Sequence, residues 1–352
     1  MTLSKRAVLA FVSAALAAIV VAGCGGSSDT TSSSTSGSST SASSGSGGTT
    51  LNLVAYSTPK KAYDALTAAY GQTAQGKGVS FSESFGASGT QSRAVASGQP
   101  ADVVAFSTEP DMSTLVKAGL VSSSWDSNSA GGVPSDSVVV FVVRKGNPKG
   151  ITGWDDLIKP GVDVVTPNPS TSGSARWNVL AGYGAELKEG KSPAAALAYI
   201  KTLLTKNVSV QPSSASSALQ TFVAGKGDVL LDYESDALAA EKAGDAIQIV
   251  YPKQTILIQT PVAATLKAKP AAAQFVQWLY SPAAQTIWAE QGYRPVLASV
   301  AKKYASKFPT PPQLFNISFL GGWTKAKSEF FDPTTGSITK IEQAAGVPTA
   351  SG

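Results

Sequence analysis

The 352-residue sequence contains no histidine, and this absence narrows the possible functions sharply. Without imidazole there is no histidine general base, no histidine metal ligand, and no Ser-His-Asp or Cys-His nucleophile arrangement. The single cysteine, Cys24, excludes a disulfide within the chain and leaves no site for a soft metal. Most common hydrolytic designs are therefore excluded, and we expect neither a metal nor a cofactor.

Charged residues are also scarce, at 14% of the sequence, and the formal net charge is +5. Lys5 and Arg6 lie in a segment that we expect to be removed, which lowers the net charge to +3. The remaining basic residues are scattered, with no stripe or cluster. The sequence therefore lacks the electrostatic footprint of a nucleic-acid-binding protein, and we expect no nucleic-acid partner.

The N-terminus has the features of an export signal. Lys5 and Arg6 precede an apolar run from Ala7 to about Ala22, which is too short for a comfortable transmembrane helix and is typical of a signal peptide. Small residues directly before Cys24 match the bacterial lipobox, in which the cysteine is lipidated and becomes the new N-terminus. The alternative is an ordinary cleaved signal with an incidental cysteine.

The lipobox interpretation predicts export and anchoring by lipid at the outer face of the bacterial cytoplasmic membrane. The stretch after Cys24 is nearly all serine, glycine and threonine, so it cannot bury apolar surface and is predicted to be a flexible tether. About 300 residues then remain for a folded part, enough for two lobes. The predicted divisions are a signal peptide at 1–23, the lipidated cysteine and tether at 24–50, lobe I at 51–136 and 251–345 with C-terminal helices, lobe II at 137–250, and a disordered tail at 346–352.

Predicted strands and helices alternate along the folded part, which indicates an α/β protein with mostly parallel sheets. The expected strands span residues 51–56, 79–82, 101–106, 137–144, 162–166, 208–210, 228–233 and 247–250. The expected helices span residues 59–70, 91–97, 112–118, 154–157, a segment from 175 onwards, 194–204, 216–224, 269–280, 282–291 and 338–345. The C-terminal third is expected to be mostly helical.

Four turns share one pattern, in which a strand is followed by serine, glycine or alanine at the opening of a helix. They lie at 57–58, 87–89, 172–174 and 215–216. Unpaired N–H groups at a helix N-terminus bind anions without a cationic side chain. In open α/β sheets the ligand crevice lies at the carboxyl ends of the strands, so all four turns could face one cleft. Ordinary capping is the alternative for each turn, because serine and threonine are preferred N-caps.

Three other patterns are weaker. Residues 71–78 nearly match a P-loop, but they lack its final serine or threonine and follow a predicted helix. Residues 57–60 match S-x-x-K of serine β-lactam-binding enzymes, without an S-D-N or K-T-G partner. Asp228, Asp232 and Glu234 suggest a metal or acid–base site. Strand alternation places Asp232 opposite its apolar neighbours, so a solvated face is expected there.

Several segments resemble the sulfate-binding proteins of ABC importers. They span residues 85–91, 143–149, 166–178, 206–208, 227–230, 293–295 and 321–323, and the resemblance runs from about Leu51 to Lys340. It implies a two-lobed type II periplasmic-binding-protein fold, each lobe a mostly parallel sheet flanked by helices, with the ligand cleft between the lobes. It also implies a monomeric binding protein, not an enzyme, that delivers sulfate to the permease subunits of an ABC transporter.

The resemblance further implies a site that holds dehydrated sulfate through neutral donors, with no salt bridge. The donors it implies are the backbone N–H of Ser57, the turn at Ser88 and Gly89, the Ser172 hydroxyl with the N–H groups of Gly173 and Ser174, the N–H of Ala215, and the side chain of Tyr233. The sequence departs from the family pattern at four positions. The family has aspartate at position 57, commonly glycine at 174, arginine at 216, and an indole where Tyr233 stands.

These departures bear on selectivity more than on oxyanion binding, because a phenol can both donate and accept a hydrogen bond. Another oxyanion (thiosulfate, molybdate, tungstate or phosphate) is therefore the alternative ligand. Two alternatives come from other functional classes. One is a cell-surface hydrolase that uses Ser57 and Lys60, and the other is an adhesion or scaffold lipoprotein with an empty cleft.

Overall fold

The computed structural model describes residues 48–349. The predicted signal peptide at 1–23, the predicted lipidation site Cys24 and the tether up to residue 47 lie outside the described residues, as does the end of the predicted tail at 350–352. Within residues 48–349, no helix combines the length and the apolar character needed to cross a membrane.

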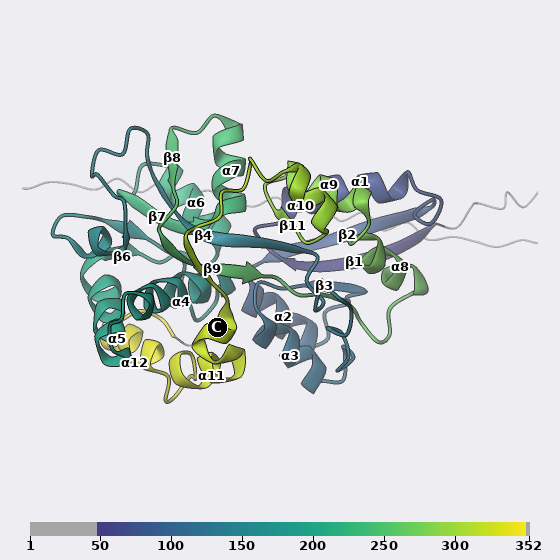
Figure 1. Cartoon of the computed structure of the whole chain (residues 1–352). Helices are drawn as coiled ribbons and strands as arrows, with labels where there is room; N and C mark the ends of the chain where they lie inside the picture. Colours follow the sequence, from purple (N-terminus) through teal and green to yellow (C-terminus); the bar gives the residue numbers. More distant parts are fainter. Residues whose placement is uncertain (1–47, 350–352) are drawn as a thin grey trace, which may run out of the picture. The chain divides into compact units, whose positions relative to one another are not determined.

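The first sheet has four strands in the order β10-β3-β1-β2 (Figure 1). Its strands are β1 (Thr49–Tyr56), β2 (Val79–Gly86), β3 (Val103–Ala105) and β10 (Val262–Ala264). β1 pairs in parallel with β2 and β3, and β10 runs antiparallel to β3. Helices cover both faces: α1 (Lys60–Gly71), α8 (Pro270–Trp278) and α9 (Pro282–Glu290) pack on one, and α2 (Ser88–Ala96) and α3 (Glu109–Lys117) pack on the other.

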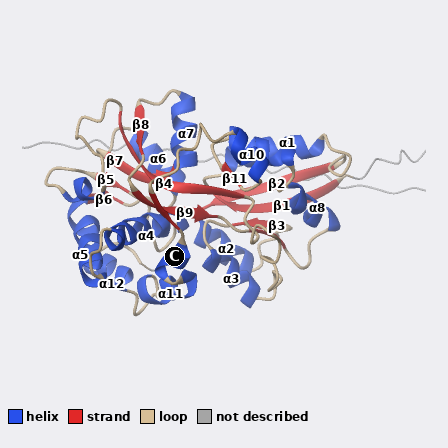
Figure 2. Ribbon diagram, in the orientation of Figure 1, coloured by secondary structure: helices blue, strands red, loops and turns tan. Residues whose placement is uncertain are grey.

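The second sheet runs β12-β9-β4-β7-β5-β6, and β8 and β11 also pair with β4. Figure 2 labels β4, β5, β6, β7 and β9 of this sheet. The strands are β4 (Ser135–Arg144), β5 (Val164–Val165), β6 (Val208–Val210), β7 (Val229–Tyr233), β8 (Ile247–Val250), β9 (Gln254–Gln259), β11 (Arg294–Pro295) and β12 (Gln313–Phe315). β5 is parallel to β6 and β7, and β9 to β12. β4 is antiparallel to all of its partners, so the sheet is mixed.

Helices also cover both faces of the second sheet. One face packs against α4 (Gly173–Lys188), α5 (Pro193–Thr202), α11 (Gly322–Phe330) and α12 (Ser337–Ala344). The other face packs against α6 (Ala215–Val223) and α7 (Glu234–Ala243). The remaining helices are α10 (Ala298–Lys303), the 3₁₀ helices η1 (Trp154–Ile158) and η3 (Ile317–Leu320), and the π-helix η2 (Leu203–Asn207). The predicted α/β class, with sheets flanked by helices, is thus confirmed.

The segment 251–345, which the sequence assigned to one lobe, is divided between the two sheets. β10, α8 and α9 join the first sheet, while β9, β12, α11 and α12 join the second. The expectation of a mostly helical C-terminal third misses β9, β10 and β12. Part of the predicted disordered tail contacts the folded part, because Asn168 Nδ2 donates to the carbonyl of Pro348 at 2.9 Å.

The prediction of a solvated face for Asp232 is wrong, because this side chain is 0% exposed. Alternation along β7 does separate Leu231 from Asp232, but α6 and α7 cover the face on which Asp232 lies. The sequence analysis did not identify α7, which begins at Glu234 directly after β7 with no turn between them. An alternating polar position on a strand therefore does not imply exposure when both faces of the sheet carry helices.

Asn178 fastens α4 to the second sheet. Its amide is fully buried, and Nδ2 donates to Thr166 Oγ1 at 3.0 Å and to the carbonyl of Leu231 at 2.8 Å. We expect Asn178→Ala to lower the free energy of unfolding by about 1–3 kcal/mol, because it leaves buried acceptors unpaired. Urea denaturation measures this, with the exposed Ser328→Ala as control at less than about 0.5 kcal/mol. Equal midpoints for the two variants would show that Asn178 does not fasten α4.

Candidate functional site

A small cavity lies where the carboxyl ends of strands from both sheets meet the first turns of helices. The volume open to the centre of a water molecule is about 10 Å³, close to the minimum for one water-sized group. A space of this size admits only a small ligand and leaves no room for an organic substituent. The cavity is lined by Tyr56, Ser57, Thr58, Ala87, Ser88, Ser107, Ser172, Gly173, Ser174 and Ala215.

All four turns singled out in the sequence contribute to this one cavity. Helices α2 and α4 open onto it, and neither has a side chain that caps its N-terminus. Among residues 48–349, the N–H groups of Ser88, Gly173 and Ser174 donate to no other protein group. Free N–H groups at the positive end of a helix dipole form an anion-binding arrangement. At these two helices the capping alternative therefore fails.

Two further N–H groups complete the lining. Ser57 follows β1, and its N–H has no acceptor within the described part of the chain. The N-cap of α6, Ser214, accepts from Ser217 N at 3.2 Å, and the N–H of Ala215 is left without a protein acceptor among residues 48–349. The cavity thus collects backbone donors from the ends of β1, α2, α4 and α6.

The Ser88 hydroxyl is already committed to protein partners. It donates to Asp111 Oδ2 at 2.6 Å and accepts from Ser107 N at 2.9 Å. Asp111 on α3 also accepts from Thr108 Oγ1 at 2.9 Å, and its Oδ1 lies 3.6 Å from Arg176 Nη1 on α4. Ser88 therefore offers the cavity its backbone N–H, and Asp111 links the first sheet to α4.

Ser172 and Ser174 form a buried hydroxyl pair with their Oγ atoms 2.8 Å apart. Only one of the two can donate to the other, so the pair keeps one hydroxyl proton for a ligand. The family commonly has glycine at position 174. The serine here adds a neutral hydroxyl that holds the Ser172 side chain in place.

Two of the predicted site residues do not line the cavity. Tyr233 is fully buried behind it, with its Oη 2.7 Å from Ser107 Oγ, and burial raises the pKa of this phenol so that it stays neutral. Gly89 donates its N–H to the carbonyl of Thr171 at 3.2 Å, so this donor is used within the protein. Besides Tyr56, the last residue of β1, the lining residue that the sequence analysis missed is Ser107. It follows β3 and precedes α3, the same strand–serine–helix pattern as the four turns.

No lysine or arginine is among the residues that line the cavity. The nearest carboxylates approach it indirectly, Asp111 through Ser88 and Asp236 through Thr58, whose Oγ1 donates to Asp236 Oδ2 at 3.0 Å. An anion in this cavity would therefore be held by neutral donors alone.

The residues proposed for alternative sites are engaged elsewhere. Lys60 donates to Asp64 at 2.9 and 3.0 Å, which favours its charged ammonium form, whereas a Ser57 hydrolase would need the neutral amine as its base. Asp228 and Glu234 do not converge on Asp232. Asp228 accepts from Asp163 N at 2.9 Å and lies 3.4 Å from Lys149, and Glu234 pairs with Arg294 at 2.6 and 2.8 Å.

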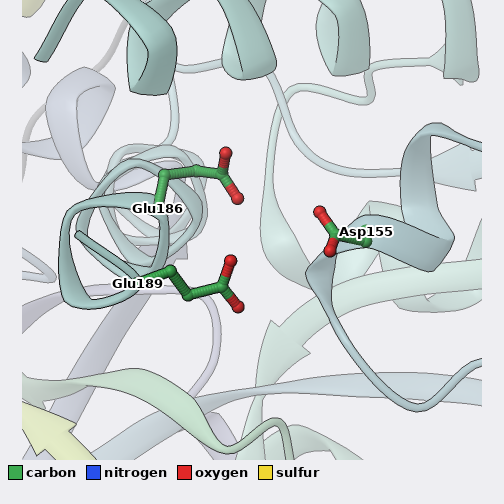
Figure 3. A group of neighbouring side chains, drawn as sticks. All are labelled: Asp155, Glu186 and Glu189. Carbon is green, nitrogen blue, oxygen red and sulfur yellow. The ribbon is translucent and has the colours of Figure 1, made fainter. Parts of the chain in front are cut away.

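A group of three carboxylates lies apart from the cavity, at η1 and the end of α4 (Figure 3). Asp155, Glu186 and Glu189 each place one oxygen within 4.8 Å of the others. The ammonium group of Lys191 lies 3.5, 2.9 and 3.2 Å from oxygens of Asp155, Glu186 and Glu189 respectively. Because a lysine already supplies the positive charge at this point, we assign the group no metal.

Gly173 allows α4 to approach the first sheet closely. A Cβ at this position would lie 2.5 Å from Ser107 Oγ and 2.6 Å from Ser107 Cβ. We expect Gly173→Ala to destabilise the protein by about 1–3 kcal/mol through this overlap, measured by thermal unfolding. The matched control is Gly71→Ala in α1, where a Cβ meets nothing within 4 Å. Equal melting temperatures for the two variants would contradict the close approach.

Comparisons with known proteins indicate the family. A family model described as a bacterial extracellular solute-binding protein matches residues 51–294. A sulfate-binding protein of Synechococcus elongatus is 38% identical over 308 residues, covering 84% of this chain and 87% of the relative. A sulfate-binding protein of Escherichia coli strain K12 is 40% identical over 295 residues, covering 79% and 88%.

The fold comparison gives the same result. The solved structure of the sulfate-binding protein SubI from Mycobacterium tuberculosis H37Rv matches with a TM-score of 0.79 and 45% sequence identity, and the match covers 81% of this chain and 100% of that chain. The chain therefore belongs to the bacterial extracellular solute-binding proteins, in the group that includes these sulfate-binding relatives.

Proposed function

We propose that this protein captures sulfate in the small cavity and delivers it to an ABC importer. The observation that carries the proposal is the convergence of backbone N–H groups from Ser57, Ser88, Gly173, Ser174 and Ala215 on one cavity without a cationic side chain. The family is one of solute-binding proteins, not of enzymes. The names of the relatives support sulfate as the first candidate ligand.

The energetics of such a site are favourable. A dianion taken out of water must be fully hydrogen-bonded, and a hydrogen bond to a charged group contributes about 1.5–3 kcal/mol net. Five such donors, together with the one hydroxyl proton that the Ser172–Ser174 pair keeps for a ligand, offset enough of the desolvation cost to allow micromolar binding, which corresponds to about −8 kcal/mol. The helix dipoles of α2 and α4 add to this because their positive ends face the ion.

Selectivity follows from the number of protons on the ligand. Sulfate only accepts hydrogen bonds, whereas phosphate at neutral pH carries a proton that needs an acceptor. Backbone N–H groups offer no acceptor, so they leave that proton unpaired. Thiosulfate, molybdate and tungstate also lack such a proton, and the cavity chemistry admits them as alternative ligands.

Contacts between the two sheets close the cavity around its contents. Trp177 Nε1 on α4 donates to the carbonyl of Ser107 at 2.8 Å. The contacts described above for Thr58, Gly89, Tyr233 and Asp111 are further links. Release of the ion would require these links to break as the lobes separate. The closed arrangement is then the form that we expect to be recognised by the permease.

Calorimetry on the delipidated protein tests the ligand directly. We expect one sulfate per monomer with micromolar or tighter affinity, roughly −8 kcal/mol or better. Phosphate should compete weakly, and least at the acidic end of a titration between about pH 6 and pH 8, where more of it carries a second proton and less charge. No heat with sulfate, thiosulfate, molybdate or tungstate would remove the proposal.

The Ser172 hydroxyl offers a sharper test. We expect Ser172→Ala to weaken sulfate binding by about 1–3 kcal/mol, because one donor to a charge is lost. The matched control is Ser170→Ala, two residues earlier in the same loop and outside the cavity lining. Equal affinities for the two variants would show that the site has been placed wrongly.

We also propose that the mature chain is attached to the membrane by lipid at Cys24. The support is the sequence alone, with small residues before the only cysteine and a serine- and glycine-rich tether after it. Metabolic labelling with a radioactive fatty acid in a bacterial host should label the wild type and leave Cys24→Ala unlabelled. Labelling of both proteins, or of neither, would count against the anchor.

A further inference from the structure

Two buried carboxyl groups lie directly behind the cavity, and the proposed binding mechanism does not use them. Asp232, near the end of β7, is 0% exposed, and Asp236, in the first turn of α7, is 7% exposed. Asp232 Oδ1 accepts from Tyr233 N at 2.8 Å, while Oδ2 has no hydrogen-bond partner among residues 48–349. The two side chains lie within hydrogen-bonding reach of each other.

A proton on this pair resolves the unpaired oxygen. Two adjacent carboxylates in a dry environment cannot both ionise. A proton held between Asp232 and Asp236 gives each side chain a partner and halves the buried charge. Burial raises the pKa of Asp236 to about 7, and burial followed by the charge of Asp236 raises the pKa of Asp232 well above its usual range.

The pair is connected to the first sheet by a single hydrogen bond. Thr58 follows β1 and lines the cavity, and its hydroxyl donates to Asp236 Oδ2 at 3.0 Å. A groove of about 660 Å³ runs past this contact, with Asp236, Thr58, Lys61 and Tyr293 among the residues that line it. Separation of the lobes would break the bond and open Asp236 to the water in this groove.

The other groups that face the pair do not neutralise it. The charge of Lys61 on α1 lowers the pKa of Asp236. Because Lys61 is exposed, its effect on this pKa is smaller than the effects of burial and of the hydrogen bonds. The phenols of Tyr56, Tyr233 and Tyr293 surround the pair, and burial raises the pKa of each, so they stay neutral. On α7 itself, Glu234 accepts two hydrogen bonds from the guanidinium group of Arg294, so the charge of Arg294 is paired with Glu234 and not with the two aspartates.

We propose that Asp232 and Asp236 form a proton-binding site coupled to the anion cavity, so that closure around sulfate takes up a proton and opening releases it. The inference rests on the proposed function, because it requires a closing step driven by sulfate. The ligand of the new site is a single proton, shared between the two carboxyl groups. It keeps the charge behind the cavity low while a dianion is held in front of it.

The sign of the pH dependence follows from this coupling. The pKa of Asp236 is raised in the closed form and falls towards the ordinary carboxyl value, about 4, when the open form exposes it to water. Protonation of the pair therefore strengthens sulfate binding. The full increase in affinity is reached below the open-form pKa, and it is lost as pH rises through the closed-form pKa of about 7. Between these values the affinity for sulfate tightens by at most about tenfold for each unit of acidification.

Calorimetry with sulfate between about pH 5.5 and pH 8.5 tests the coupling, because sulfate itself stays a dianion and takes up no proton over this range. We expect binding at least about threefold tighter at pH 6 than at pH 8, and a proton uptake between zero and one when buffers of different ionisation heat are compared. Unchanged affinity with no proton uptake would overturn the proton site and leave sulfate binding intact. No sulfate binding at any pH would overturn both proposals.

Substitutions locate the proton. In Asp232→Asn the amide donates permanently to Asp236, so we expect sulfate binding to persist without proton uptake and with a flat pH profile. If Asp232→Asn fails to fold, Asp236→Asn tests the same expectation, because the amide oxygen at position 236 can still accept the hydrogen bond from Thr58. The matched control is Glu342→Gln: burial also raises the pKa of Glu342 to about 7, but its partner Gln211 belongs to the same lobe. Proton uptake that survives in both aspartate variants, or disappears in the control, would overturn the assignment.

Discussion

Backbone N–H groups that find no acceptor among residues 48–349 are the constraint on which the rest of this structure depends. A buried donor without a partner costs free energy, and here several such donors face one small cavity at the ends of β1, α2, α4 and α6. An oxyanion satisfies them all at once. The strand order and the helix packing can be understood as the scaffold that brings these helix N-termini to a common point.

The scaffold also has to bring two separate sheets close together, and small residues at the junction make this possible. Gly173 lies so close to Ser107 that no side chain fits at position 173. The Ser88 hydroxyl donates to Asp111 and therefore does not point its proton into the cavity. Among residues 48–349, the contacts across the junction include a hydrogen bond between neutral groups, from Trp177 to Ser107, the hydrogen bond from Thr58 to the carboxyl group of Asp236, and one long ion pair, between Asp111 and Arg176. Contacts of this kind are individually weak, as the proposed opening of the cavity requires.

The buried acids behind the cavity fit the same logic. A carboxylate close to a bound dianion would oppose it, and a low-dielectric environment makes that opposition larger. Asp232 and Asp236 share the space behind Tyr233 and Thr58, where a retained proton removes one of two charges. Anion binding and proton binding then favour the same closed arrangement, although no side chain of the pair lines the cavity.

The sequence by itself determined the fold class and the local chemistry of the site. The absence of histidine removed most catalytic designs, and the serine- and glycine-rich turns after predicted strands located Ser57, Ser88, Ser172 and Ala215, because strand periodicity and helix-start signals are local. Only the tertiary structure decided which donors are free. Gly89 and the Ser88 hydroxyl are used by distant partners, Ser107 replaces Tyr233 at the wall, and Asp232 is buried by a helix that the sequence did not reveal. Each of these outcomes depends on contacts between residues far apart in the chain, which no local pattern contains.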